Sequence, residues 1–373
     1  MTEKRNVKLP RVLKYVILTT LLFPVAVMAG QSDDLAAKLR KDARRSFTEG
    51  RYKQTEDYLR QAAAEAELAK TSGPDLALIL GDLANVLLTT KKYDEAEDLL
   101  NRAIVILKSD PSDDRRLLPI LLGNLGKLYQ QTGRLDRSEE VLRESLHLGK
   151  KFLVDEPLYL ADLHNNLGVV HLDTRKLKQA ERDFKTALAL IEKAPRANEI
   201  RKAQVFANLS TLYFIGEKWS LAEDTLLRSI ELVEGLQGPS HPNLCPLLEN
   251  LGYLYIKSGD MPHAEKILRR ELELRRTAFG TENVATALAT STLANVLSVQ
   301  GKYDEAGKLF TEALNTQERM LGRSPEVAAT LDQFANYLRR TNNNTLAGDM
   351  ASRAELIRLE IGYTVSVEDL RRR

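Results

Sequence analysis

Residues 293–306 have the sequence LANVLSVQGKYDEA, and this pattern of small and large residues recurs along the chain. Leu293 precedes the small Ala294, the large Tyr303 follows nine residues after Ala294, and the small Ala306 comes three residues later. Small residues let two helices approach closely, and a glycine such as Gly301 favours a helix end. The stretch therefore predicts a helix A, a tight turn and a helix B.

The large-small pair returns with a nearly constant period. Successive spacings are 42, 42, 42, 42, 42 and 41 residues, and a weaker first copy lies 41 residues earlier, at Ala43. In helix B a second row of small residues is interrupted once, by Glu271. A constant period predicts stacked helix pairs, here eight repeats over residues 34–361. The pairs are Leu83-Ala84, Leu125-Gly126, Leu167-Gly168, Leu209-Ser210, Leu251-Gly252, Leu293-Ala294 and Phe334-Ala335.

These landmarks resemble tetratricopeptide repeats, and the long period is similar to the subclass found in kinesin light chains. Three pieces carry the likeness: residues 238–242 (GPSHP), residues 250–252 (NLG) and residues 301–306 (GKYDEA). The resemblance covers about residues 34 to 361. It implies an all-α fold, an α-α superhelix (a tetratricopeptide solenoid) whose A helices line the concave face, and a general role in binding proteins or peptides.

Asparagines recur beside the small landmark of helix A, and the resemblance places them in the groove. One row stands two residues before the landmark and another one residue after it. An amide offers donors and acceptors, so such a row can bind the backbone of an extended peptide. The alternative is that the amides satisfy backbone groups of their own repeats. The candidate binding residues are Asn85, Asn124, Asn165, Asn166, Asn208, Asn250, Asn295, Asn336, Lys127 and Tyr253.

Composition and motifs argue against several function classes. The net charge is +2, and basic residues form no extended run beyond the first fourteen residues, which argues against nucleic-acid binding. The sequence contains no phosphate-binding glycine loop and no serine-hydrolase or zinc-protease motif. His164 and His171 lie at positions where sister repeats carry bulky core residues, so core packing is favoured over a metal site. We expect no cofactor, no metal and no catalytic residues.

The first thirty residues have the pattern of an export signal. Five basic residues lie within residues 1–14, an apolar stretch runs from Tyr15 to Val27, and small residues precede the polar Gln31. This arrangement is typical of a secretory signal peptide, with a cut after Ala29. The rival interpretation is an uncleaved membrane anchor, although the uninterrupted run of sixteen residues from Tyr15 to Gly30 falls short of the roughly 20 that span a bilayer. Either interpretation predicts export, most plausibly to a bacterial periplasm.

The sequence thus predicts three parts: a signal peptide over 1–29, one solenoid over 34–361 and a tail over 362–373. The leading hypothesis is a non-catalytic scaffold of the cell envelope that holds an extended peptide or a partner protein in its groove. The alternatives are a self-assembling structural component and an accessory subunit of an envelope enzyme or secretion complex. Membrane contact is expected only if the N-terminal segment stays uncleaved, and the oligomeric state is left open.

Overall fold

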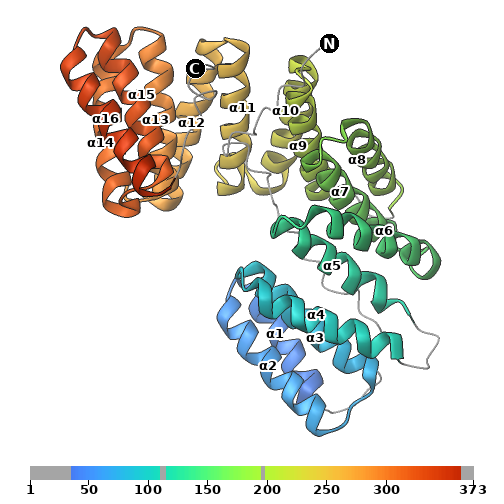
Figure 1. The fold of residues 1–373 in the computed structure, drawn as a ribbon. Helices are drawn as coiled ribbons and strands as arrows, with labels where there is room; N and C mark the ends of the chain where they lie inside the picture. The colour runs from blue at the N-terminus through green and yellow to red at the C-terminus, as the bar shows by residue number, and fades with distance from the viewer. Residues whose placement is uncertain (1–34, 110–114, 195–197, 363–373) are drawn as a thin grey trace. The chain divides into compact units, whose positions relative to one another are not determined.

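The computed structural model describes residues 35–109, 115–194 and 198–362. These residues form sixteen α-helices and one short 3-10 helix, and none of them lies in a strand (Figure 1). The predicted all-α architecture of eight helix pairs is therefore confirmed. The predicted signal peptide lies outside the described residues, as does the predicted tail apart from Gly362.

The helices alternate between the two predicted types. The A helices are α1 (Leu35–Thr48), α3 (Gly73–Thr89), α5 (Leu117–Gln131), α7 (Pro157–Asp173), α9 (Glu199–Ile215), α11 (Cys245–Ser258), α13 (Val284–Val299) and α15 (Pro325–Arg340). The B helices are α2 (Tyr52–Leu68), α4 (Tyr93–Ser109), α6 (Leu135–Phe152), α8 (Leu177–Glu192), α10 (Trp219–Gln237), α12 (Met261–Phe279), α14 (Tyr303–Leu321) and α16 (Asn344–Glu360). The 3-10 helix η1 (Pro242–Leu244) leads into α11.

Contacts divide the chain into two compact units, with the boundary between Leu212 and Tyr213, inside α9. In each unit an A helix packs against the B helix of its own repeat and against the B helix before it. Neighbouring A helices also touch, as α3 does with α5, α5 with α7, and α13 with α15. We call these units the 35–212 unit and the 213–362 unit.

The small landmark residues lie where the A and B helices of one repeat approach most closely. A Cβ atom built on Gly126 would lie 2.5 Å from Leu142 Cγ, and one on Gly168 would lie 2.5 Å from Phe184 Cε1. The Leu142 and Phe184 side chains are fully buried. The landmark is therefore small because a large side chain of helix B fills the space beside it.

The turn between helix A and helix B uses the same backbone conformation in all eight repeats. The residue two before each B helix has a positive φ, which favours glycine. The predicted glycines Gly50, Gly133, Gly259 and Gly301 have φ between +73° and +83°. In the other four repeats Lys91, Arg175, Glu217 and Asn342 adopt φ between +56° and +62°. The turn geometry is thus set by helix packing and tolerates residues other than glycine.

Glu271, the exception in the second row of small residues, is fully buried in α12. Its Oε1 accepts a hydrogen bond of 2.6 Å from Arg275 Nε, and Arg275 Nη2 donates to Glu249 Oε2 of α11 at 2.7 Å. Burial raises the pKa of Glu271 to about 8, against the opposing effect of Arg275. Two repeats later Asp332 and Arg358 form the same contact between α15 and α16. A polar pair therefore replaces apolar packing in these repeats.

Ion pairs join consecutive B helices. A basic residue just before a B helix bonds a glutamate in the B helix of the preceding repeat. These four pairs are Lys92–Glu56 at 2.8 Å, Arg134–Glu97 at 2.6 Å, Lys176–Glu139 at 2.6 Å and Lys302–Glu265 at 2.5 Å. In each pair the carboxylate is buried or largely buried and the basic side chain is more exposed, so these contacts join neighbouring repeats at a fixed register.

We predict that Gly252→Ala destabilises the 213–362 unit, because the new Cβ would lie 2.6 Å from Leu268 Cδ2. Overpacking of a filled core costs about 1–3 kcal/mol. Gly235→Ala is the matched control: it lies in the last turn of α10, and no atom comes within 4 Å of its Cβ position. That change should be neutral or slightly stabilising, because a mid-helix glycine costs about 0.5–1 kcal/mol and the effect is smaller near a helix end. Urea unfolding of the two variants measures both effects, and equal midpoints would contradict the packing account.

Candidate functional site

Polar side chains gather along one side of the A helices in the 35–212 unit. All but one of them stand within the six residues before the small landmark or directly after it. The exception is Arg201, which lies nine residues before the landmark. Residues spaced by three or four share a helix face, and contacts between successive A helices confirm that these side chains meet. We call this surface the A face. It comprises Arg40, Arg44, Asp82, Asn85, Asn124, Lys127, Asp162, Asn165, Asn166, Arg201 and Asn208.

Several A-face side chains bond across the repeats. Arg40 Nε lies 2.5 Å from Asp82 Oδ2, which joins α1 to α3. Arg201 Nε lies 3.0 Å from Asp162 Oδ1, which joins α9 to α7. On the same two helices Asn208 Nδ2 donates to Asn165 Oδ1 at 2.9 Å. These contacts fix the spacing of the A helices and use part of the polar surface.

The charged groups of the A face are strongly desolvated. Asp82 is fully buried, and burial raises its pKa although Arg40 and Arg44 act in the opposite direction. Burial likewise raises the pKa of Asp162, against Arg201 and Lys127. It lowers the pKa of Lys127, which Asp162 partly restores. A polar ligand that replaces the lost hydration is therefore bound more strongly here than on an open surface.

Some A-face atoms have no partner in the described chain. The buried atoms without a hydrogen bond include Asn124 Nδ2, Asp82 Oδ1, and Nε and Nη2 of Arg44. An unsatisfied buried polar atom costs about 1–3 kcal/mol. Asn166 and Lys127 are partly exposed, and no hydrogen bond or ion pair within the described residues involves their side chains. The A face thus offers both donors and an acceptor.

The predicted binding residues fall into both units and differ in exposure. Asn85, Asn124, Asn165 and Asn208 are buried in the 35–212 unit, and Asn250 is buried in the other unit. The structure brings Asn165 and Asn208 into contact, and it places Asn124, Lys127 and Asn166 on the neighbouring helices α5 and α7. Asn166, Lys127, Tyr253 and Asn295 are partly exposed, and Asn336 is exposed and accepts a bond from Arg339 at 2.8 Å.

In the 213–362 unit the surroundings of Tyr253 are aromatic. Its ring centroid lies 5.5 Å from that of Phe214, and Lys257 Nζ lies 5.4 Å from the Tyr253 ring. Trp219 packs edge-on against Phe214. Burial raises the pKa of Tyr253 to about 12. Tyr253 therefore belongs to an aromatic cluster and does not extend the row of amides.

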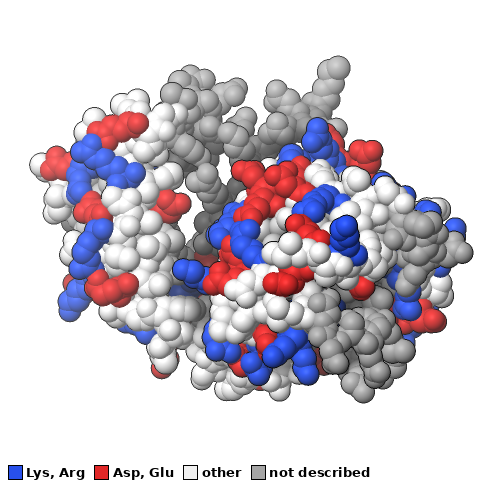
Figure 2. Space-filling view, turned by 90° about the horizontal axis from the view of Figure 1, so that it is seen from below, with Lys and Arg blue, Asp and Glu red and all other residues white. Residues whose placement is uncertain are grey.

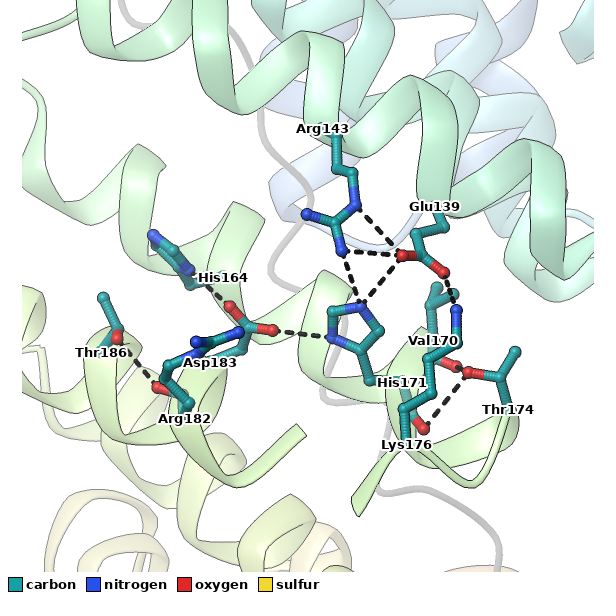
Figure 3. Close-up of polar contacts among 10 residues, drawn as sticks. All are labelled: Glu139, Arg143, His164, Val170, His171, Thr174, Lys176, Arg182, Asp183 and Thr186. Atoms are coloured by element: carbon teal, nitrogen blue, oxygen red, sulfur yellow. Dashed lines mark hydrogen bonds and ion pairs between the residues drawn. The ribbon is translucent and has the colours of Figure 1, made fainter. Parts of the chain in front are cut away.

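Sequence reasoning missed Arg201 and the polar setting of the two histidines. Arg201 follows Asp162 by 39 residues, so it stands outside the 42-residue rows that drew attention to the other sites. His171 is buried and His164 largely so, as expected at core positions, yet both bond Asp183 of α8 (Figure 3). Asp183, which follows His171 by twelve positions, was the feature of the sequence that could have indicated this bond.

The described residues show a mixed surface charge on the face drawn in Figure 2 and no cluster of metal ligands. On the face shown in Figure 2, Lys and Arg side chains alternate with Asp and Glu and form no single-sign patch. Within the described residues, no set of three or more His, Cys, Asp or Glu side chains is arranged to hold a metal ion. In the same residues, no helix is long and apolar enough to cross a bilayer.

Comparison with known proteins identifies the repeat. The tetratricopeptide repeat profile matches residues 75–151, 117–193, 159–234, 199–277 and 279–357. The chain belongs to the tetratricopeptide repeat family. A search of curated protein sequences gave no match. The predicted tetratricopeptide solenoid is thus confirmed, and the family assignment supports a protein-interaction scaffold.

Solved structures with similar folds include the following proteins. The apo quorum sensor NprR from B. thuringiensis has a TM-score of 0.64 at 12% identity, over 88% of this chain and 89% of that one. BtubC (BKLC) from P. vanneervenii has a TM-score of 0.50 at 23% identity, over 67% and 94%. A putative kinesin light chain from Podosopora anserina has 0.49 at 15%, over 56% and 99%. The likenesses to NprR and BtubC, at these low identities, concern the fold alone.

We predict that Arg40→Leu destabilises the 35–212 unit by about 3–5 kcal/mol, because it removes the bonded partner of a buried carboxylate. Adding Asp82→Asn should recover most of the loss, since the amide carries no charge and is the residue that stands 42 positions later, at Asn124. Thermal unfolding of the single and double variants checks this. A double variant as unstable as Arg40→Leu alone would show that the ion pair is not the cause.

Proposed function

We propose that this tetratricopeptide protein is a non-catalytic scaffold that binds an extended peptide along the A face of the 35–212 unit. The observation that carries the proposal is the set of buried A-face atoms without partners, above all Asn124 Nδ2 and the Arg44 guanidinium. A peptide backbone supplies carbonyl acceptors for these donors and N–H donors for Asp82 Oδ1. Binding would satisfy groups that the fold alone leaves unpaired.

The predicted asparagines fall into two classes, according to whether the amide group already forms a hydrogen bond within the protein. The amide nitrogen of Asn124 is buried without a partner among the described residues, and Asn166 is partly exposed, whereas Asn165 and Asn208 hold each other. We propose that the first pair contacts the peptide and the second pair spaces α7 and α9. The bond between Asn165 and Asn208 joins two repeats and involves no backbone group, so it differs from both original interpretations of the asparagine rows.

The geometry also suggests the length of the guest. Five A helices, α1 to α9, contribute to the A face, and packed helix axes lie about 8–10 Å apart. The face then extends over about 40 Å, which an extended chain covers in about twelve residues at roughly 3.3 Å each. Arg40, Arg44, Lys127 and Arg201 outnumber Asp82 and Asp162, so a guest without excess positive charge is favoured.

A library of unstructured linear peptides of about twelve residues, screened by fluorescence polarisation on the full chain, tests the proposal. For the best binder, Asn124→Ala with Asn166→Ala should weaken affinity roughly tenfold or more, at about 0.5–1.5 kcal/mol per lost hydrogen bond. Its melting temperature should hardly change.

The matched control is Asn165→Ala with Asn208→Ala, which removes the same number of amides from the same face. This pair should lower the melting temperature, while the affinity of the folded fraction falls less than in the first pair. Equal binding by wild type and the Asn124/Asn166 variant would refute the proposed contact.

We further propose that the scaffold works outside the cytoplasm, in the cell envelope. The support is the basic segment, the apolar stretch Tyr15 to Val27 and the small residues near Ala29. We predict that N-terminal sequencing of the protein from a bacterial envelope fraction begins at Gly30 or Gln31. An intact Met1 in the membrane fraction would favour the anchor, and an intact Met1 in the cytoplasm would contradict export.

A further inference from the structure

Six consecutive repeats carry a glutamate at the same place, four residues after the start of helix B. In two junctions a tyrosine of the next A helix contacts this glutamate: Tyr255 donates to Glu223 Oε1 at 2.6 Å, and Tyr129 bonds Glu97. A hydroxyl thus links one repeat to the next. The glutamates are Glu56, Glu97, Glu139, Glu181, Glu223 and Glu265.

In the fourth repeat His171 stands where Tyr129 stands in the third, 42 residues earlier. Its Nε2 lies 3.3 Å from Glu139 Oε1 of α6, which is the glutamate of that row (Figure 3). The same Nε2 lies 3.4 Å from Arg143 Nη2. This junction therefore has an imidazole where the third repeat has a phenol. Glu139, an acceptor, and Arg143, a donor, both lie beside Nε2 of that imidazole.

The other ring nitrogen faces a second acid that the third repeat lacks. His171 Nδ1 lies 2.7 Å from Asp183 Oδ2, and His164 Nδ1 lies 2.9 Å from Asp183 Oδ1. In the third repeat the places of Asp183 and His164 are held by Val141 and Leu122. Three substitutions relative to its neighbour thus convert an apolar contact into two imidazoles that share one carboxylate.

The protonation state of His171 decides which group on α6 it bonds. A protonated ring donates from both nitrogens, to Asp183 and to Glu139. A neutral ring that donates from Nδ1 to Asp183 has only an acceptor at Nε2, which suits Arg143 and faces Glu139 unfavourably. Loss of the proton therefore exchanges an ion pair with Glu139 for a hydrogen bond that an uncharged ring accepts from Arg143.

We propose that His164 and His171 form a proton-controlled contact that holds α6 against α7 and α8 more tightly at pH 6 than at pH 8. The charged groups that contact the two rings are Glu139 and Arg143 from α6 and Asp183 from α8. Lys176, before α8, bonds the other oxygen of Glu139. Within the described residues, no ion pair joins either ring to α5 or α9.

The acids of the contact remain charged throughout this range. Although burial raises the pKa of Asp183, its bonds from His164 and His171 lower it to about 2. Lys176, followed by Arg143 and His171, lowers the pKa of Glu139 to about 2 against the effect of burial. Lowered carboxyl pKa values stabilise the fold above the usual carboxyl range, and this stabilisation is lost only as the pH falls towards 2.

Hydrogen exchange of the full chain at pH 6 and pH 8, corrected for the intrinsic rate, tests the proposal. Amides of α6 and α7 that face the junction should open several-fold more readily at pH 8, because the ion pair with Glu139 is then replaced by the weaker contact. The junction of α4 with α5 is the internal control, because Tyr129 and Arg134 bond Glu97 there without a histidine. Its opening should not depend on pH, and an equal pH dependence at the two junctions would overturn the proposal.

A variant that copies the third repeat provides the second arm: His164→Leu, His171→Tyr and Asp183→Val, the residues found at 122, 129 and 141. Its α6 junction should lose the pH dependence while α4 and α5 stay unchanged. Retention of the wild-type pH dependence in a folded variant would also overturn the proposal. If the variant does not fold, the comparison of the two junctions in the unaltered protein still decides the question.

Discussion

The close approach of helix A to helix B within each repeat is the constraint from which the other features follow. At Gly126 and Gly168 a single methyl group would collide with Leu142 or Phe184. Close packing also lets Ser138 Oγ of α6 donate to the Gly126 carbonyl of α5 at 2.6 Å. Because each pair is held in this way, the next pair stacks on it in the same orientation. The polar residues beside the landmark then lie in rows.

The sequence predicted the fold well because its decisive contacts are local and repeated. The spacing of landmarks such as Gly252 and Ala294 located all eight pairs, and the predicted glycine turns have the expected positive φ. In the sixth repeat helix A is preceded by the short 3-10 helix η1, and α11 begins at Cys245. There His241 Nδ1 accepts from the Asn243 N–H at 3.2 Å and caps the turn, a local effect that periodicity does not reveal.

The candidate site was less predictable, because its chemistry depends on which side chains pair across repeats. The rows of asparagines were visible in the sequence, and several of these residues do meet. The bond between Asn165 and Asn208 was not foreseen, since it joins two positions that are 43 residues apart and belong to different columns of the repeat. Similarly, the ion pair between Arg40 and Asp82 was not foreseen from the sequence. Which long side chains pair depends on the three-dimensional arrangement of the helices, which the spacing of residues in the sequence does not reveal.

The pairing divides the A face into groups that build the scaffold and groups that remain for a guest. Asn165, Asn208, Arg40 and Asp162 belong to the first class, because their bonds set the spacing between helices. Asn124, Asn166 and Lys127 belong to the second. A tetratricopeptide surface can in this way combine side chains that hold the helices together with side chains that have no partner in the described parts of the chain.

The most direct measurement is a crystal structure of the full chain with a selected peptide of about twelve residues. The account predicts an extended main chain on the A helices of the 35–212 unit, with a carbonyl oxygen within hydrogen-bonding distance of Asn124 Nδ2. A peptide bound instead to the B helices, or on the A helices with Asn124 and Asn166 still unpaired, would contradict it.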